Sequence, residues 1–198
     1  MVKKVLYSVI GVAALILVLL LFIGNNLPEQ KQTVATQQPV SVASTSVPVL
    51  DTQKVITELT TSTDYYSQLL ATGKQALGTI QYPNATAGLS ALNDPNSAAS
   101  KFSSFRTETC IKNDPSVNAM NTYRSVSDQY TVAKVQSPDA LDNWNYDTNT
   151  VVSDICAWAS VAADWQISKV SSAQLKVVEQ KVSDDLVKAR LDMQTVAK

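Results

Sequence analysis

The fold of this chain is decided by residues 138–168, which read PDALDNWNYDTNTVVSDICAWASVAADWQIS. Apolar and small residues recur there in two rows with a spacing of seven. The first row is Leu141, Thr148, Ile155 and Ala162, and the second is Trp144, Val151, Trp158 and Trp165. Large rings on one row beside smaller side chains on the other are typical of a helix packed against other helices. The stretch therefore predicts a long helix inside a helical bundle.

Helical spacing of apolar residues also runs through most of the chain after Asp51. It predicts further helices at about 52–78, 95–112, 115–135 and 172–197. The expected core residues of these four helices are, in order, Val55, Leu59, Tyr66, Leu69/Leu70 and Leu77; Ala98, Phe102, Phe105 and Thr109; Val117, Met120, Tyr123, Ser127 and Tyr130; and Leu175, Val178, Val182, Leu186, Ala189, Met193 and Val196. We expect an all-α fold in which residues 51–198 form an antiparallel bundle of four to five amphipathic helices.

Local signals indicate where these helices begin. Asp51 is a suitable N-cap, and Asp-Pro pairs at residues 94–95 and 114–115 place a capping side chain before a proline at the first helical position. Ser171 and Gln174 fit a capping box. Residues 81–93 contain Pro83 and Gly88 and are expected to form a loop.

A second feature is the uncharged run Val5–Ile23, VLYSVIGVAALILVLLLFI. As a helix it spans roughly 28 Å, close to the hydrocarbon thickness of a bilayer. We expect residues 5–24 to form a transmembrane signal-anchor helix that contacts the lipid bilayer. Lys3 and Lys4 favour a cytoplasmic end at residues 1–4, with the bulk of the chain on the other side of the membrane. A cleaved signal peptide is the alternative.

Residues 25–50 are rich in Gln, Ser and Thr and contain Pro28, Pro39 and Pro48. This composition predicts an extended linker between the membrane and the bundle. The expected location is thus that of a single-pass membrane protein, with residues 51–198 in the periplasm or on a cell or virion surface.

The two cysteines, Cys110 and Cys156, both fall in the segment expected outside the cytoplasm. They follow the core residues Thr109 and Ile155, so each lies at the flank of a packed face. An oxidising compartment favours a disulfide between them. Two buried free thiols are the alternative.

The composition narrows the range of functions. The chain has 16 Lys and Arg, 17 Asp and Glu, and no His. Without a basic stripe, nucleic acid is not an expected partner. Without His, the commonest general base and metal ligand is missing. No phosphate-binding, dinucleotide or serine-hydrolase motif is present, so we expect no catalytic residues, metal or cofactor.

Three groups of residues are candidates for function. Trp144, Trp158 and Trp165 share one face, which is either core or an aromatic groove for a ligand or a partner. Asp147, Asp154 and Asp164 lie near this row, as a carboxylate-dependent glycan hydrolase would require, whereas Asp184 and Asp185 are expected on the helix surface. Asn84-Ala85-Thr86 is a glycosylation sequon, which makes Asn84 a possible modification site.

These observations favour a membrane-anchored, non-enzymatic extracytoplasmic helical bundle that acts through protein contacts. Such a protein would be an accessory or structural subunit of a membrane, envelope or virion-membrane complex, with a protein partner or a second copy of itself. An extracytoplasmic ligand-binding module that uses the Trp-lined face is the first alternative. A carboxylate-dependent envelope hydrolase is the second and less favoured one.

Overall fold

The computed structural model describes residues 48–196, and this part of the chain is helical without any strand. Its elements are α2 (Thr52–Leu77), α3 (Ala85–Ala91), α4 (Ala98–Thr107), the π-helical turn η1 (Glu108–Lys112), α5 (Ser116–Ala133), α6 (Asp139–Gln166) and α7 (Ser172–Val196). The all-α prediction is confirmed for the described residues. The predicted transmembrane helix at residues 5–24 and most of the predicted linker lie outside them. Among the described helices, none combines the length and hydropathy that a membrane span needs.

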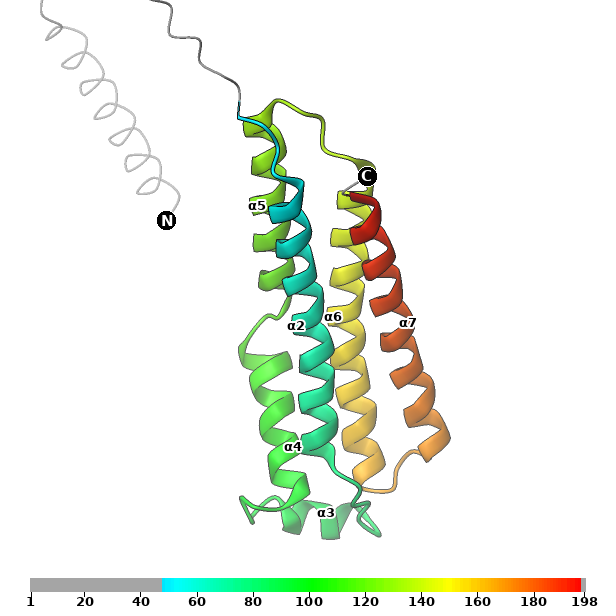
Figure 1. The fold of residues 1–198 in the computed structure, drawn as a ribbon. Coiled ribbons are helices and arrows are strands. Elements are labelled where there is room, and N and C mark those ends of the chain that lie inside the picture. The colour runs from blue at the N-terminus through cyan, green and yellow to red at the C-terminus, as the bar shows by residue number, and fades with distance from the viewer. Residues whose placement is uncertain (1–47, 197–198) are drawn as a thin grey trace, which may run out of the picture. The chain divides into compact units, whose positions relative to one another are not determined.

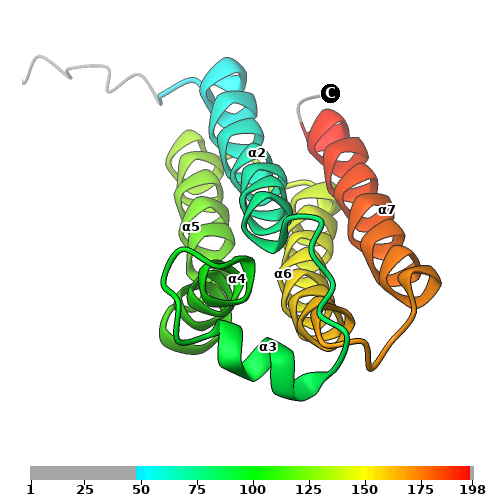
Figure 2. The same ribbon diagram turned by 90° about the horizontal axis from the view of Figure 1, so that it is seen from below.

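The helices form an antiparallel bundle with four positions (Figure 1). Helices α2, α6 and α7 each occupy one position, and α4 and α5 follow one another along the fourth. The short helix α3 lies across the end of the bundle where α2 ends and α4 begins (Figures 1 and 2). Helices α6 and α7 make the most extensive contact of any pair.

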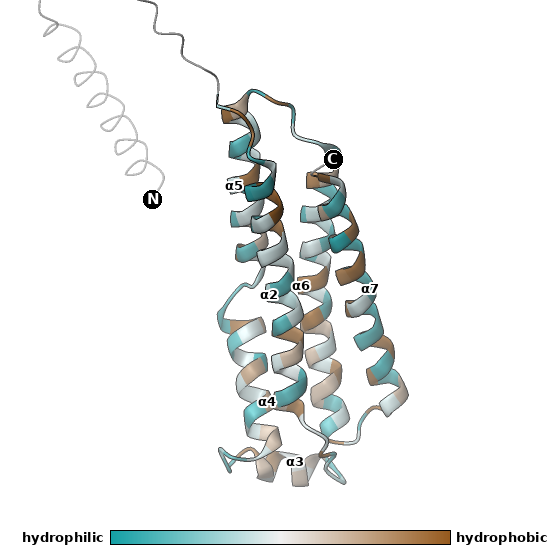
Figure 3. Ribbon diagram, viewed as in Figure 1, coloured by the Kyte–Doolittle hydropathy of each residue, from teal (hydrophilic) through white to brown (hydrophobic). Residues whose placement is uncertain are grey.

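The long helices α2, α5, α6 and α7 each carry both hydrophilic and hydrophobic residues (Figure 3). Both predicted rows of α6 are buried except for Trp165 in the last turn. The predicted seam of α7 is buried at Leu175, Val182, Leu186, Ala189 and Val196. The heptad pattern therefore identified the central helix pair correctly.

The prediction of a loop at residues 81–93 is wrong, because residues 85–91 form α3. The Oδ1 atom of Asn84 accepts a hydrogen bond from the Ala87 N–H at 2.9 Å and caps this helix. Gly88 is buried, and a Cβ atom there would clash with Cγ2 of Ile167. Because Gly88 has no side chain, α3 can approach the end of α6, and this packing outweighs the low helix propensity of glycine.

The predicted core face of α5 is also wrong in part. Val117 and Met120 are 43% and 38% exposed, whereas α5 buries Ala119, Val126, Tyr130 and Ala133. The orientation of α5 is set at its first turn by the buried hydroxyl of Tyr66 on α2, which accepts a hydrogen bond from the Ala119 N–H at 3.0 Å. This contact directs Ala119 into the bundle and turns Val117 and Met120 outward.

The helix predicted at 95–112 begins later and ends in a different form. Asp94 accepts a hydrogen bond from the Asn96 N–H, which makes a turn, and Ser97 caps α4 by accepting from the Ser100 N–H. The last part of the segment widens into η1. The capping predictions at Asp51 and at Ser171–Gln174 are confirmed by hydrogen bonds of 2.8–3.2 Å.

Candidate functional sites

The structure joins Cys110 and Cys156 in a disulfide. Their Cα atoms are 5.7 Å apart, and the bond closes a loop with a sequence separation of 46 residues. Cys110 lies in η1 and Cys156 in α6, so the bond holds the break between α4 and α5 against the central helix. In this position the disulfide has a structural role, because it fixes the segment between α4 and α5 to α6.

Two of the three tryptophans lie in the core. Trp144 and Trp158 are both fully buried, and the Trp144 indole N–H donates to Oγ1 of Thr63 at 3.0 Å. The ring of Trp158 packs edge-on against Phe102 and Phe105, with centroids 5.8 and 6.4 Å away. Trp165 is partly exposed and donates to Oγ of Ser172. The row as a whole is therefore part of the packing between helices, and its open portion is limited to Trp165.

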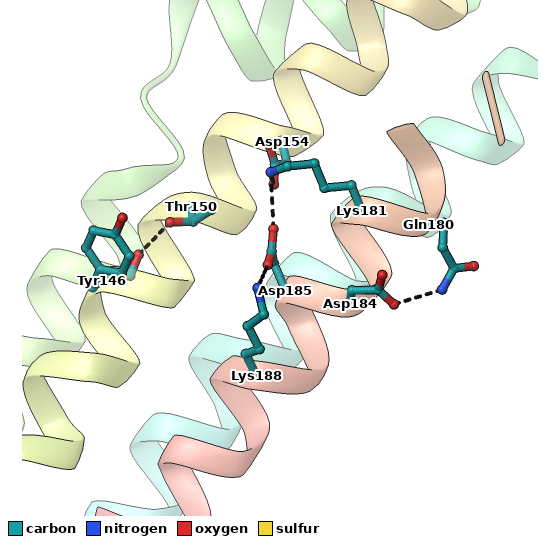
Figure 4. Close-up of polar contacts among 8 residues, drawn as sticks. All are labelled: Tyr146, Thr150, Asp154, Gln180, Lys181, Asp184, Asp185 and Lys188. Atoms are coloured by element: carbon teal, nitrogen blue, oxygen red, sulfur yellow. Dashed lines mark hydrogen bonds and ion pairs between the residues drawn. The ribbon is translucent and has the colours of Figure 1, made fainter. Parts of the chain in front are cut away.

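Charged side chains between α6 and α7 form a small network (Figure 4). Asp185 is 4% exposed, contrary to the prediction that it lies on the helix surface. Its carboxylate is 2.5 Å from Nζ of Lys188 and 3.3 Å from Nζ of Lys181. Lys181 also forms an ion pair with Asp154 on α6. Asp185 is buried because the two lysines supply its charge partners at the edge of the seam.

The pKa values of the two carboxyl groups in this network are shifted in opposite directions. Burial raises the pKa of Asp154, and the neighbouring Asp185 adds to that effect, while the ion pair with Lys181 opposes it. Burial would also raise the pKa of Asp185, but hydrogen bonds from Lys188, Asp154 and Lys181 outweigh it and lower the pKa to about 2. Asp185 is thus ionised at neutral pH, with its charge fully paired.

The acids near the tryptophan row each interact with a different partner. Asp154 pairs with Lys181, and Asp164 lies 3.8 Å from Nζ of Lys169. Asp147 lies close enough to Asp192 to raise the pKa of that carboxyl, in addition to the effect of burial, which is larger. Within residues 48–196 no group of three or more acidic, histidine or cysteine side chains is placed to hold a metal ion.

A polar groove runs between α2 and α5. Its middle part has a volume of about 360 Å³ and is lined by Thr57, Glu58, Thr61, Ser62, Asn118, Asn121, Thr122 and Ser125. It shares Asn118 and Asn121 with a hollow of about 430 Å³ near η1, and Ser125 with one of about 350 Å³ near Pro48. Hydrogen bonds from Ser62 to Asn118 and from Ser125 to Glu58 join the two helices along this row. We call the three neighbouring hollows together the α2–α5 groove.

The α2–α5 groove is lined by hydroxyl and amide groups and is acidic. Its charged residues are Asp51, Lys54, Glu58, Glu108, Asp114 and Asp128. Hydrogen bonds from Ser116 lower the pKa of Asp114, so this carboxylate stays ionised. Val117 and Val132 line its two ends and are 43% and 58% exposed. The groove thus combines negative charge, hydrogen-bonding groups and apolar contact area.

A smaller cavity lies between α3, α4 and the end of α6. Its volume is about 160 Å³, and its walls are mostly apolar. We call it the α3–α4 cavity. Asn84 caps α3 near this end of the bundle and is exposed, so its side chain is accessible to a modifying enzyme. Glycosylation at Asn84 remains a prediction.

Comparison of the chain with protein-family models, with curated proteins and with solved structures finds no match. The function is therefore inferred from the residues and their arrangement.

Sequence reasoning missed the residues that shape these sites. The spacing of Val182, Asp185 and Ala189 already places Asp185 beside the seam of α7, and this signal could have identified it. Gln166 is 4% exposed and lies four residues after the core residue Ala162, which is a weaker signal of the same kind. The α2–α5 groove has no sequence signal, because it depends on how two helices that are far apart in sequence pack against each other.

Proposed function

We propose that this chain is a membrane-anchored, non-enzymatic extracytoplasmic protein that binds a protein partner along the α2–α5 groove. In this role it is an accessory or structural subunit of a membrane, envelope or virion-membrane complex. The observation that supports the proposal is the groove itself, a row of three neighbouring hollows along α2 and α5.

The chemistry of the groove indicates what kind of segment it binds. Five carboxylates and one lysine line it, and two of these carboxylates already pair with lysines, Glu58 with Lys54 and Glu108 with Lys112. Asp51, Asp114 and Asp128 form no salt bridge among the described residues, which favours a basic segment of the partner. Its hydroxyl and amide groups can pair with main-chain or polar side-chain groups. Val117 and Val132 offer apolar contacts at the two ends. Because surface charges are screened by salt, partner binding should weaken as ionic strength rises.

The buried tryptophans and the paired acids favour this role over the two alternatives. A Trp-lined ligand site requires open rings, and Trp144 and Trp158 are fully buried. A hydrolase of the retaining or inverting kind requires two carboxyl groups that flank a substrate. Two of the acids near that row are instead paired with lysines, Asp154 with Lys181 and Asp164 with Lys169.

Membrane attachment is the second part of the proposal, and the uncharged run at residues 5–23 supports it. The bundle would then sit on the outer side, joined by the linker at residues 25–50. We expect the full-length chain to stay in the membrane pellet after alkaline carbonate washing. N-terminal sequencing that finds a mature start after residue 24 would refute the anchor.

Site-specific crosslinking in the intact membrane tests the partner site. A photoreactive residue is placed at Thr61 or Asn121 in the groove of the full-length chain. Matched controls carry it at Lys176 or Gln180, which are exposed on α7. We expect one discrete adduct from both groove positions, reduced at high salt, and none from the controls.

The mass of the adduct identifies the partner. An adduct with a different protein supports the proposal, and its peptide map should contain a basic segment. An adduct of twice the chain mass would instead indicate self-association. Equal adducts from the groove and the control positions, or none from either, would overturn the assignment of the groove.

A further inference from the structure

The α3–α4 cavity has the size of a single aromatic ring. Its volume is about 160 Å³, and Leu89, Leu92, Phe102, Ala163 and Ile167 contribute to its walls. A dry protein cavity of roughly 150 Å³ with similar Leu, Ile and Phe walls binds benzene. The end of the bundle that contains this cavity is seen in Figure 2, where α3 lies beside α4 and the end of α6.

The cavity communicates with the surface. Phe102 is 1% exposed and lies in its interior wall, whereas Leu89 and Leu92 on α3 are 62% and 41% exposed. A ligand can therefore enter beside α3 without unfolding of the bundle. The close approach of Gly88 to Ile167 holds α3 in place over this site.

Gln166 supplies a polar group in the deeper wall. The residue is 4% exposed, and its Nε2 donates to the Leu77 carbonyl oxygen at 3.1 Å. Its side-chain oxygen has no hydrogen-bond partner among the described residues. A ligand that donates a hydrogen bond can therefore pair with this oxygen in place of water. A hydroxyl group on the ring meets this requirement.

Arg106 supplies a positive charge at the rim. The residue is partly exposed, and the only hydrogen bond of its side chain to a described residue is to Oγ of Ser160, at a long 3.4 Å. Within residues 48–196 it forms no salt bridge. A guanidinium group in this position is suited to bind a carboxylate.

We propose that the α3–α4 cavity binds a single-ring aromatic carboxylate with a hydroxyl group at the opposite end of the ring. The ring fills the apolar space, the hydroxyl donates to the side-chain oxygen of Gln166, and the carboxylate pairs with Arg106. 4-Hydroxybenzoate is the simplest compound of this class. The site is separate from the α2–α5 groove, so its ligand does not depend on the proposed protein partner.

Four probes separate the contributions of ring, hydroxyl and carboxylate: benzene, phenol, benzoate and 4-hydroxybenzoate. Each is titrated into the full-length chain in lipid nanodiscs while the backbone amide resonances are followed. We expect 4-hydroxybenzoate to bind most tightly and to shift the amides of Gly88, Leu89 and Ile167. The absence of saturable shifts at these amides with all four probes would overturn the proposal.

Substitutions assign the two polar contacts. Arg106→Gln should weaken binding of 4-hydroxybenzoate and benzoate about tenfold and leave phenol unchanged, because one charge-assisted contact is lost. Arg124→Gln, at an exposed arginine on α5, is the matched control and should bind as the wild type. Gln166→Leu should weaken phenol and 4-hydroxybenzoate while leaving benzoate unchanged.

Filling the cavity gives an independent test. Ala163→Leu places additional carbon atoms in the cavity and should abolish binding of every probe, including benzene. If this variant does not fold, the comparison of Arg106→Gln with Arg124→Gln still decides the question. Wild-type affinity for 4-hydroxybenzoate in Arg106→Gln would refute the carboxylate contact and thus the proposed class of ligand.

Discussion

The hydroxyl group of Tyr66 donates a hydrogen bond to the carbonyl oxygen of Pro115, with 2.7 Å between the two oxygens. The same hydroxyl accepts from the Ala119 N–H at 3.0 Å. Tyr66 is fully buried, and burial raises its pKa, so the group stays protonated and able to donate. One side chain of α2 thereby satisfies two main-chain groups at the start of α5, where the chain resumes its helix after the break at η1.

Tyr66→Phe should lower the free energy of unfolding by about 1–3 kcal/mol, because the buried Ala119 N–H loses its partner and the Pro115 carbonyl keeps only a longer hydrogen bond, from the Asn118 N–H at 3.4 Å. Urea unfolding of the full-length chain in mild detergent, followed by circular dichroism, measures the change. Tyr65→Phe is the matched control at an adjacent, 39% exposed tyrosine and should change stability by less than about 0.5 kcal/mol. Equal effects of the two substitutions would contradict the role given to Tyr66.

Gly73→Ala should destabilise the bundle although alanine is the better helix former. A Cβ atom at this buried position in α2 would lie 2.7 Å from ring atoms of both Phe105 and Trp158. The gain in helix propensity is about 1 kcal/mol, and forcing a methyl group into a packed core costs about 1–3 kcal/mol. We therefore expect a net loss of stability in the same unfolding assay.

A neighbouring control separates the two effects at Gly73. Thr72 is exposed on the same helix, so Thr72→Ala raises the helix propensity without a steric clash and should be neutral or stabilising. Adding Phe105→Leu to Gly73→Ala should recover part of the loss by making room for the methyl group. A stabilising effect of Gly73→Ala alone would show that the contact between these helices is looser than described.

Removal of the disulfide should lower stability by at most about 4 kcal/mol, the loop-entropy estimate for a separation of 46 residues. Cys110→Ala/Cys156→Ala tests this in the unfolding assay. Dithiothreitol should shift the unfolding midpoint of the wild type by the same amount and have no effect on the double variant. A wild-type midpoint that is insensitive to dithiothreitol would mean that the bond contributes nothing to stability.

The core of α6 and α7 could be predicted from the sequence because its pattern repeats. Residues spaced by seven on one straight helix keep the same side toward the neighbouring helix. The four members of the first row are all buried accordingly: Leu141, Thr148, Ile155 and Ala162. The pattern fails at Trp165 in the last turn of α6, where the ring is partly exposed. A seven-residue spacing of apolar residues therefore predicts the packing of long uninterrupted helices and is less reliable at their ends.

The arrangement at η1 and α3 could not be predicted, because it depends on contacts between residues far apart in sequence. The buried face of α5 follows from the hydrogen bonds of Tyr66, which is 53 residues before Ala119. The position of α3 follows from the contact of Gly88 with Ile167. The α2–α5 groove and the α3–α4 cavity adjoin these same two places. The candidate sites consequently lie next to parts of the structure that local sequence patterns do not predict.

Stability should fall below pH 4 because of Asp185. Its pKa is about 2 in the native protein against an ordinary value of 3.8, so its contribution is fully present above about pH 4 and is lost as the pH falls toward 2. Since its lysine partners are largely exposed, this contribution is at most about 2 kcal/mol. Asp154 has a raised pKa and acts in the opposite direction, because protonation of its carboxyl favours the native state as the pH falls.

Comparison of Asp185→Asn with the wild type between pH 2 and 7 isolates this contribution. At pH 7 the variant should be less stable, because Lys181 and Lys188 lose their shared carboxylate. As the pH falls below 4 the two proteins should converge, since protonation removes the same charge from the wild type. Asp184→Asn is the matched control at an exposed neighbour whose carboxylate accepts a hydrogen bond from Gln180, and its stability curve should run parallel to that of the wild type at every pH. If the stability of Asp185→Asn also ran parallel to that of the wild type between pH 2 and 7, this carboxylate would have the same pKa in the folded and the unfolded chain. Its contacts with the two lysines would then contribute nothing to the pH dependence of stability.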